Sequence, residues 1–388
     1  MMGITKLADL IRGSAPGAVS HREIGDYIGK VIALDTSIIV NQFRSAVPSL
    51  QLSPLLGLFF RTLTFLEHDI KPVFVFDGKP PSQKRAVLEK RAQSAGWNSS
   101  HRSDTGECRT GSVLNKRTAQ LLFSERIYSQ PALLPSAHVD HYNSRVSTKT
   151  QEFLRLLQLM GVPYIMAPAD GEALCANLVR SGVAHAVASE DMDTLAFGGT
   201  ILLRQLNAKR VSEVTEYSLP KLLDTLQLTQ KEFVDLCILL GCDYCDKIAG
   251  LGPTRALKLI QQHRTIEDVL QNINRKTHSV PLGWQYQAAR RLFLEAPQAG
   301  TSELAWSDPD EEGLVKFLCV EKHVKEERVR GRMEKFRQNL SKQRKQREEE
   351  KREGRTRQSR MDEFLRVTRK RSSADAVLSD SEKRAKTK

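Results

Sequence analysis

The sequence predicts an α/β fold, with a mostly parallel, twisted sheet flanked by helices. Three short apolar runs, VIALD, PVFVFDG and VAHAVASEDMD, are rich in β-branched or aromatic residues and are bounded by turn residues. Long segments with helical spacing, such as SPLLGLFFRTLTFLEH and TKTQEFLRLLQLMG, separate them. Strands that alternate with helices form a parallel sheet buried on both faces. Ligands of such sheets bind beyond the carboxyl ends of the strands, where each of these runs ends in an aspartate.

Further elements follow the third run. The segment ILLRQL predicts another strand, and QKEFVDLCILLG predicts a helix. The turn Gly250-Leu251-Gly252-Pro253 then opens a second helix, because proline suits the first helical position. Residues 92–145 contain glycines, serines and two late prolines without sustained periodicity, which is typical of a functional lid or a disordered insertion.

The charge distribution separates a body from a tail. The chain has 388 residues with 59 basic and 46 acidic side chains, a net charge of +13, and residues 321–388 hold 24 of the basic and 13 of the acidic ones. The tail is nearly without apolar residues, so we expect a helix at first and disorder beyond about residue 340. The predicted organisation is an N-terminal region 1–91, an atypical insert 92–145, an internal region 146–320 and the basic tail 321–388.

The composition argues against several classes of protein. No apolar run approaches the ~18 residues that a membrane helix needs, and the N-terminal segment carries charges inside its apolar stripe, unlike a signal peptide. Of the six cysteines only Cys242 and Cys245 are regularly spaced, which does not make a disulfide framework. We expect a soluble, intracellular protein with no membrane partner.

Seven acids stand where predicted strands or helices begin or end, in segments otherwise poor in charge. They are Asp35, Asp77, Asp170, Glu172, Asp191, Asp193 and Asp243. Two carboxylates at ~4 Å repel by ~4 kcal/mol at an effective dielectric constant near 20, so a converging set needs divalent cations to stay ionised. Oxygen ligands favour Mg²⁺ or Mn²⁺. Two such ions in one carboxylate site are a standard device for hydrolysing a phosphodiester.

The alternative is that these acids are helix caps and surface groups. Asp35, before Thr36 and Ser37, and Asp170 could each be an N-cap. Their coincidence at one edge of the predicted sheet favours the metal site. Asp191 and Asp193 add weight, since residues two apart in an extended strand point the same way.

The motifs resemble a known family over residues 3–91 and about 146–320. MGITKLADLI, VIALDTS, IKPVFVFDGKPP, LMGVPYIMAPADGEA, SEDMDTLAFG and FVDLCILLGCDYCDKIAGLGPTRALKLI are similar to the eukaryotic flap endonucleases of the structure-specific 5′-nuclease family. The resemblance implies a PIN-like 5′-nuclease fold with two Mg²⁺ per chain, for which Mn²⁺ can substitute. It assigns the first ion to Asp35, Asp77, Asp170 and Glu172, and the second to Asp191, Asp193 and Asp243.

The resemblance also implies DNA contacts. Lys84 and Arg91, seven residues apart and so on one helix face, resemble a basic pair at the scissile phosphate, although they could equally be solvated cations. Residues of about 230–265 resemble a helix–two-turn–helix motif, whose free N–H groups attract phosphate and where the family also places a K⁺. The implied DNA-binding residues are Arg61, Gly250, Gly252, Thr254 and Arg255.

A further motif lies in the tail. Gln358, Met361, Phe364 and Leu365 resemble the segment by which replication proteins bind the sliding clamp (PCNA). The basic runs 369–371 and 383–388 are similar to nuclear import signals. The implied protein is a monomer in the nucleus, with the nucleolus and mitochondria as further locations.

The chain departs from the family in four places. Asp170-Gly171-Glu172 replaces a Glu-x-Glu, and because aspartate is shorter and glycine costs ~1 kcal/mol in a helix, we expect weaker metal binding there. Asn41 stands where a tyrosine usually stacks on a base. Residues 92–145 lack the composition of the family's charged helical arch, so we expect duplex binding to survive and selection of free 5′ ends to be impaired. The doubled methionine predicts initiation at Met2 and processing to Gly3.

The sequence therefore predicts a Mg²⁺-dependent 5′ flap endonuclease and 5′–3′ exonuclease that acts on branched DNA in replication and repair, including Okazaki fragment maturation and long-patch base excision repair. One alternative is a catalytically weakened homologue that binds DNA and the clamp. Another is a nuclease of the same family that acts on bubbles or junctions.

Overall fold

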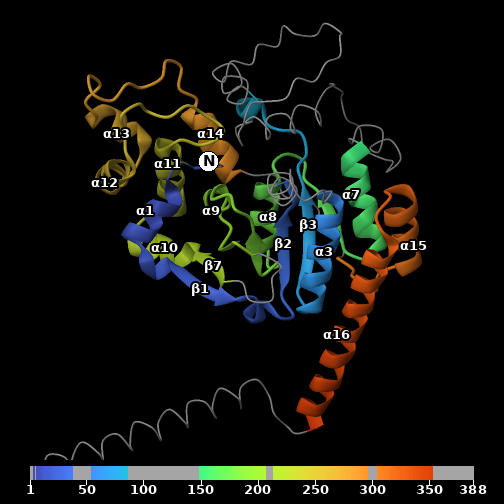
Figure 1. Cartoon of the computed structure of the whole chain (residues 1–388). Coiled ribbons are helices and arrows are strands. Elements are labelled where there is room, and N and C mark those ends of the chain that lie inside the picture. Colours follow the sequence, from blue (N-terminus) through green and yellow to red (C-terminus); the bar gives the residue numbers. More distant parts are fainter. Residues whose placement is uncertain are drawn as a thin grey trace, which may run out of the picture. The chain divides into compact units, whose positions relative to one another are not determined.

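The computed structural model describes residues 3–4, 6–37, 54–85, 148–206, 213–295 and 304–352. The chain divides into two compact units, Met1–Lys325 and Glu326–Lys388. The first unit contains the sheet and the predicted acids (Figure 1). The second contributes one described helix.

The first unit is built on a seven-stranded sheet of order β1-β7-β6-β5-β2-β3-β4. Its strands are β1 (Val19–Glu23), β2 (Val31–Asp35), β3 (Lys71–Phe76), β4 (Tyr164–Met166), β5 (Ala186–Ala188), β6 (Ile201–Arg204) and β7 (Glu213–Ser218). The pairs β2–β3, β2–β5, β3–β4 and β5–β6 are parallel, whereas β7 pairs antiparallel with β6 and β1. The predicted mostly parallel sheet is confirmed, and the strands expected from the three apolar runs and from ILLRQL are four of its seven strands, β2, β3, β5 and β6.

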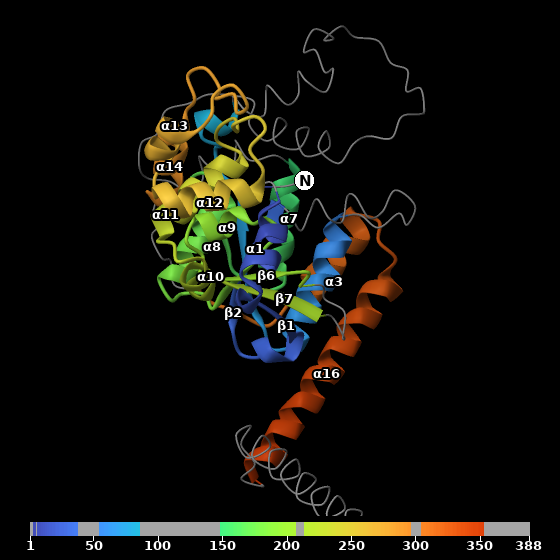
Figure 2. The same ribbon diagram turned by 90° about the vertical axis from the view of Figure 1, so that its left-hand side faces the viewer.

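Helices cover both faces of this sheet. The helices of the first unit are α1 (Leu7–Ser14), α3 (Pro54–Glu67), α7 (Thr148–Leu159), α8 (Gly171–Arg180), α9 (Asp193–Ala196), α10 (Leu219–Leu226), α11 (Gln230–Leu240), α12 (Pro253–His263), α13 (Ile266–Asn272), α14 (Tyr286–Leu294) and α15 (Glu311–Val315), with short helical turns η1 (Pro16–Ala18), η2 (Ile24–Tyr27) and η3 (Lys316–Glu321). Ala33 and Val187 pack in one buried cluster with α8, while Leu34 and Phe74 are buried outside that cluster. Since side chains alternate along a strand, these two sets point to opposite faces. Figure 2 shows α8 and α3 on opposite sides of the strands.

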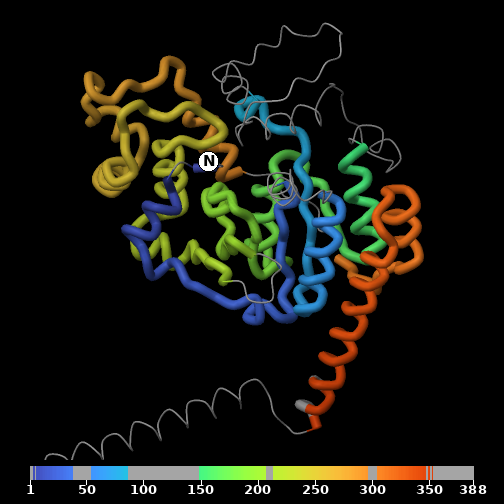
Figure 3. The backbone as a smooth tube through the Cα atoms, in the orientation of Figure 1, coloured from blue at the N-terminus to red at the C-terminus, as the bar shows by residue number. Residues whose placement is uncertain are grey.

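Helices α11 to α14 pack together beside the sheet. A capping box starts α11: the Thr229 hydroxyl accepts from the Glu232 N–H at 3.3 Å, and the Glu232 carboxylate accepts from the Thr229 N–H at 2.7 Å. After α11 the chain turns and enters α12 with Pro253 in its first turn, as predicted; Figure 3 follows this path. The two helices expected for a helix–two-turn–helix are therefore present.

The second unit contains helix α16 (Glu326–Arg352). The expectation of disorder beyond about residue 340 is wrong for residues 341–352, which continue the helix. Arginine, lysine, glutamate and glutamine are good helix formers, and neighbouring turns place opposite charges together, as Arg330 and Glu326 at 2.7 Å illustrate. Among the described helices none is long and apolar enough to cross a membrane.

Candidate functional site

The predicted acids gather at the carboxyl ends of the central strands. Asp35 is the last residue of β2, and Asp77 directly follows β3. Asp170 and Glu172 flank the start of α8, after β4. Asp191 and Asp193 follow β5, and Asp243 follows α11. Side chains of residues far apart in the sequence thus share one edge, as the alternating pattern predicts.

Asp77 is held by the loop that leads from β4 into α8. The Gly78 N–H donates to the Ala169 carbonyl at 2.6 Å, and a Cβ at Gly78 would lie 1.9 Å from the Ala167 carbonyl oxygen. Asp77 Oδ1 accepts from the Gly171 N–H at 2.7 Å, and the Ser37 hydroxyl donates to Asp77 Oδ2. Asp77, rather than Asp170, therefore satisfies the first N–H group of α8.

The structure differs from the sequence-based interpretation at Gly171 and at Asp170. Gly171 is the first residue of α8, so the helix-interior cost expected for glycine does not apply. A Cβ there would lie 2.9 Å from Asp77 Oδ1, so glycine permits this close approach. Asp170 occupies the N-cap position but makes no capping bond. The Asp170 side chain therefore does not cap α8, whereas the Asp35 side chain does accept from the Ser37 N–H at 3.2 Å.

The Asp170 carboxylate instead binds two side chains. Its Oδ1 accepts from Lys84 Nζ at 2.7 Å, and its Oδ2 accepts from the Tyr244 hydroxyl at 2.6 Å. Burial alone would lower the pKa of Lys84, but the charges of Glu172 and Asp170 hold it well above its usual value. Lys84 therefore stays a cation inside the acidic site.

The second group of acids is organised around α9. Asp191 Oδ1 accepts from the Asp193 N–H at 2.9 Å, and Asp193 Oδ1 accepts from the Ile4 N–H at 2.8 Å. Strand β5 ends at Ala188, so the prediction that this pair lies in an extended strand is wrong. A turn opens α9 here because the Asp191 carboxylate accepts the first N–H of that helix. The N-terminal segment closes the site: a Cβ at Gly3 would lie 1.8 Å from Asp191 Oδ1.

Ser189 links the two groups. Its hydroxyl donates to Asp35 Oδ2 at 3.2 Å and accepts from the Asp191 N–H at 3.0 Å. Neither this link nor that of Tyr244 is predicted from the sequence. In the sequence these two residues are marked only by their proximity to predicted acids: Ser189 lies two residues before Asp191, and Tyr244 directly follows Asp243.

The electrostatics of the site favour a bound cation. Burial, then the charges of Asp191 and Asp243, raises the pKa of Asp193 well above its usual value. Burial and the charges of Asp35 and Asp77 do the same for Glu172, although Lys84 opposes the effect. Glu172 Oε2 is buried and has no hydrogen-bond partner in the described part of the chain. Among the described residues, no group of three or more His, Cys, Asp or Glu side chains has the geometry of a formed metal site. The donor chemistry and the unsatisfied Glu172 oxygen nevertheless fit hard divalent ions.

The residues expected to bind DNA lie elsewhere on the first unit. Gly250 has φ of +74°, and a Cβ there would lie 2.9 Å from the Thr277 carbonyl oxygen, so the turn before α12 requires glycine. Gly252 is the N-cap of α12 and makes no side-chain bond, while Thr254 and Arg255 are exposed in its first turn. Arg61 donates to the Leu206 carbonyl at 2.6 Å, and burial lowers its pKa to about 10.

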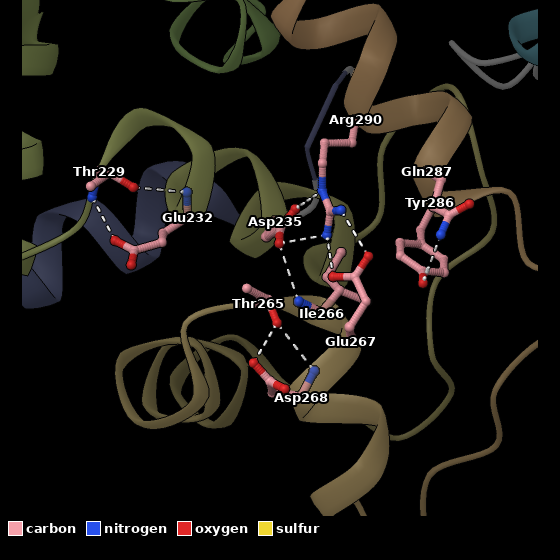
Figure 4. Close-up of polar contacts among 10 residues, drawn as sticks. All are labelled: Thr229, Glu232, Asp235, Thr265, Ile266, Glu267, Asp268, Tyr286, Gln287 and Arg290. Atoms are coloured by element: carbon pink, nitrogen blue, oxygen red, sulfur yellow. Dashed lines mark hydrogen bonds and ion pairs between the residues drawn. The ribbon is translucent and has the colours of Figure 1, made fainter.

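Helices α11, α13 and α14 are joined by an ion-pair network that the sequence does not predict (Figure 4). Arg290 donates from Nε and Nη2 to the Asp235 carboxylate at 2.5 and 2.7 Å, and from Nη1 and Nη2 to Glu267 at 2.8 Å each. Asp235 also accepts from the Ile266 N–H at 3.1 Å. The signal was a lone acid inside the otherwise apolar FVDLCILL. The network orients α11, which leads directly into the Asp243 loop.

Several predictions fall on residues outside the described ranges. These are Met1, Met2, Asn41, Arg91, the insert 92–145, the clamp motif with Gln358, Met361, Phe364 and Leu365, and the basic runs 369–371 and 383–388. They stay predictions.

Known proteins are similar to this chain over the two regions that contain the seven acids. The XPG N-terminal domain matches residues 2–96 and the XPG I-region matches residues 161–243, and together these ranges hold all seven acids. A "Probable flap endonuclease 1 homolog" of Danio rerio is 61% identical over 388 residues, covering 100% of this chain and 99% of that protein. Flap endonuclease 1 of the same organism is 41% identical over 386 residues, covering 95% and 91%. The chain belongs to the flap endonuclease family.

Solved structures of this family share the fold. The catalytic core of Rad2 in complex with a DNA substrate aligns with a TM-score of 0.65 at 21% identity, covering 86% of this chain and 100% of that one. A flap endonuclease-1 from Methanococcus jannaschii aligns with a TM-score of 0.58 at 24% identity, covering 84% and 97%. The predicted PIN-like 5′-nuclease fold is confirmed.

Proposed function

We propose that this flap endonuclease family member is a Mg²⁺-dependent 5′ flap endonuclease and 5′–3′ exonuclease that hydrolyses a phosphodiester near the junction of single strand and duplex. The observation that carries the proposal is the convergence of buried and half-buried acids beyond the strand ends, with Glu172 Oε2 left without a hydrogen-bond partner among the described residues. Membership of the flap endonuclease family supports the substrate.

Two ions would be held by the two groups of acids. Asp35, Asp77, Asp170 and Glu172 would bind one, and Asp191, Asp193 and Asp243 the other. When bound, such ions supply an activated water and stabilise charge on the attacking and leaving oxygens. The chain itself supplies the rigid frame, because hydrogen bonds from backbone N–H groups orient the carboxylates.

Lys84 would contribute a positive charge to the scissile phosphate. Its ammonium stays protonated inside the site and lies 2.7 Å from Asp170. Asp170 accepts one of the three N–H donors of the ammonium, so another would be available to a phosphate oxygen, where a preorganised charge stabilises the transition state. Arg91 would act with it.

The duplex would bind away from the acids, at the start of α12. The exposed N-terminus of this helix offers free N–H groups to a phosphate, and Gly252 without a side chain allows the backbone to approach. Thr254 and Arg255 would add contacts there, Arg61 on α3 would contact the DNA at another place, and a K⁺ would bind at the turn. Phosphate contacts position a nucleic acid without reading its sequence, as suits an enzyme that recognises DNA structure.

The tail would direct the protein to its place of work. The motif at Gln358, Met361, Phe364 and Leu365 would bind the sliding clamp (PCNA), and the basic runs would act as nuclear import signals. The protein would then act as a monomer in the nucleus, in replication and repair.

Cleavage of end-labelled DNA tests the proposed activity. The protein is incubated with a double-flap substrate, a bubble and a four-way junction, each in Mg²⁺ and in EDTA. We expect cleavage of the flap near its junction in Mg²⁺, slower cleavage of the other two substrates, and none in EDTA. Cleavage in EDTA would contradict the role of the ions, and preference for the bubble or the four-way junction would contradict the substrate.

A further inference from the structure

Tyr244 connects the two groups of acids. It directly follows Asp243, which belongs to the second group, yet its hydroxyl donates at 2.6 Å to Oδ2 of Asp170, which belongs to the first. The other oxygen of the same carboxylate accepts from Lys84 Nζ at 2.7 Å. Asp170 is therefore fixed from both sides, by a neutral donor and by a cation.

The Tyr244 ring is rigidly held. The residue is 2% exposed. The ring packs edge-on against Phe293 of α14, with centroids 5.1 Å apart and an interplanar angle of 86°, and against Phe197 at 6.1 Å and 83°. Phe197 is the C-cap of α9, the helix that Asp193 opens. One of the two helices that hold the ring, α9, thus belongs to the second group of acids, whereas the hydroxyl acts on the first group.

Lys84 also faces this ring. Its Nζ lies 5.9 Å from the ring centroid, within the range of a cation–π contact. The position of the ammonium is consequently defined by one carboxylate oxygen and one ring face, and the tyrosine determines both. A displaced Asp170 would displace Lys84 with it.

We propose that Tyr244 is a positioning residue for hydrolysis: its hydroxyl fixes the Asp170 carboxylate and, through it, the Lys84 ammonium. The inference rests on the proposed function and names a residue that is neither one of the seven acids nor one of the expected DNA contacts. Loss of a hydrogen bond to a ligating carboxylate typically lowers metal affinity or activity by about 10- to 100-fold.

Tyr244→Phe removes the hydroxyl and keeps the ring. The structure offers a matched control in Tyr27, which is also 2% exposed and whose hydroxyl donates at 2.8 Å to a carboxylate, that of Glu216 in β7, a strand that leads to none of the seven acids. Both substitutions delete one buried phenol donor to a carboxylate. A purely structural effect would therefore be common to the two variants.

Two readouts test the proposal. The first is the single-turnover cleavage rate at saturating flap DNA, with the Kd for the flap measured by fluorescence anisotropy in EDTA. The second is equilibrium binding of Mn²⁺ to the DNA-free protein, followed by electron paramagnetic resonance. We expect Tyr244→Phe to lower the cleavage rate and weaken Mn²⁺ binding by about 10-fold or more, with Kd unchanged. Tyr27→Phe should leave all three values unchanged.

A double-mutant cycle with Lys84→Ala tests the route of the effect. If the hydroxyl acts through Asp170 and Lys84, Tyr244→Phe should slow the Lys84→Ala enzyme by a smaller factor than it slows the wild type. Equal factors in both backgrounds, a wild-type rate and Mn²⁺ affinity in Tyr244→Phe, or equal losses in Tyr27→Phe would each overturn the proposal. An inactive wild type would instead contradict the proposed function, and Mn²⁺ binding would still test Tyr244.

Discussion

Arg290→Met should destabilise the fold through a single buried carboxylate. Methionine keeps an unbranched apolar stem, although a shorter one, and removes all four hydrogen bonds to Asp235 and Glu267. The Asp235 side chain is 1% exposed, and within the described part of the chain the Ile266 N–H would be its remaining hydrogen-bond donor. Removing one member of a buried ion pair costs about 3 to 5 kcal/mol, because the other charge remains buried and uncompensated.

The two carboxylates contribute unequally to that loss. The Glu267 side chain is 39% exposed, so water replaces much of what Arg290 provides, and an exposed pair contributes at most ~1 kcal/mol. The free energy of unfolding of Glu267→Gln should therefore fall by no more than ~1 kcal/mol. This variant is the matched control for Arg290→Met, since it weakens the network without leaving Asp235 unpaired.

The pH dependence of Arg290→Met has a definite sign. Burial raises the pKa of Asp235 even with Arg290 present, and without Arg290 it should rise further. The penalty for burying the carboxylate applies above this folded-state pKa and is relieved as the pH falls through it. Hydrogen bonding to Arg290 lowers the pKa of Glu267. In the wild type the Arg290–Glu267 pair therefore stabilises the fold at pH values above the unfolded-state pKa of Glu267, and this stabilisation is lost as the pH falls through the folded-state pKa. Both effects make the difference in free energy of unfolding between the wild type and Arg290→Met smaller at acidic pH.

Urea denaturation followed by circular dichroism, at neutral pH and at pH near 5, measures these differences. A loss below ~1 kcal/mol for Arg290→Met at neutral pH would refute the reasoning, as would a gap that widens in acid.

Three further predictions concern the acid site. Gly3→Ala should abolish most of the cleavage, because the residue has φ of +64° and its Cβ would overlap Asp191; a single-turnover rate like that of the wild type would exclude this tight contact. Ser189→Ala should weaken Mn²⁺ binding by about 10-fold, since it removes the link between Asp35 and Asp191; an unchanged binding isotherm would contradict that role. Mg²⁺ at 100 times its Kd should raise the free energy of unfolding by ~2.7 kcal/mol for a single site, and identical denaturation curves in Mg²⁺ and EDTA would count against metal binding to the folded state.

The central part of the fold could be predicted because buried parallel strands leave a clear trace. β2 and β3 are continuous apolar runs that end in Asp35 and Asp77, and parallel strands bring such ends together. The edge strand β1 and its neighbour β7 have the sequences VSHRE and EVTEYS. These segments are polar and partly exposed, and their antiparallel pairing gives no comparable signal, so neither was predicted.

The arrangement of the site was less accessible to sequence reasoning. The chemistry of the acids follows from their composition and position, but their hydrogen bonds depend on loops that meet only in the folded chain. Asp170 was predicted as a metal ligand, but its contacts were not: Lys84 and Tyr244 bind it from segments 86 residues before and 74 residues after it. The link through Ser189 spans 154 residues. No local pattern encodes contacts over such separations.

The most direct test of the central claim, that the acids at the sheet edge form the hydrolytic centre, is cleavage of a labelled 5′ double flap in Mg²⁺ by wild type and by Asp77→Ala, with DNA binding measured in parallel. Asp77 directly follows β3, whereas the turn proposed to bind the duplex precedes α12. Loss of several kcal/mol of charge stabilisation corresponds to at least a ~100-fold slower reaction, so we expect a wild type that cuts near the junction and a variant that binds the flap equally but scarcely cleaves it. A variant that cleaves like the wild type, or a wild type that binds the flap and never cuts it, would contradict the claim.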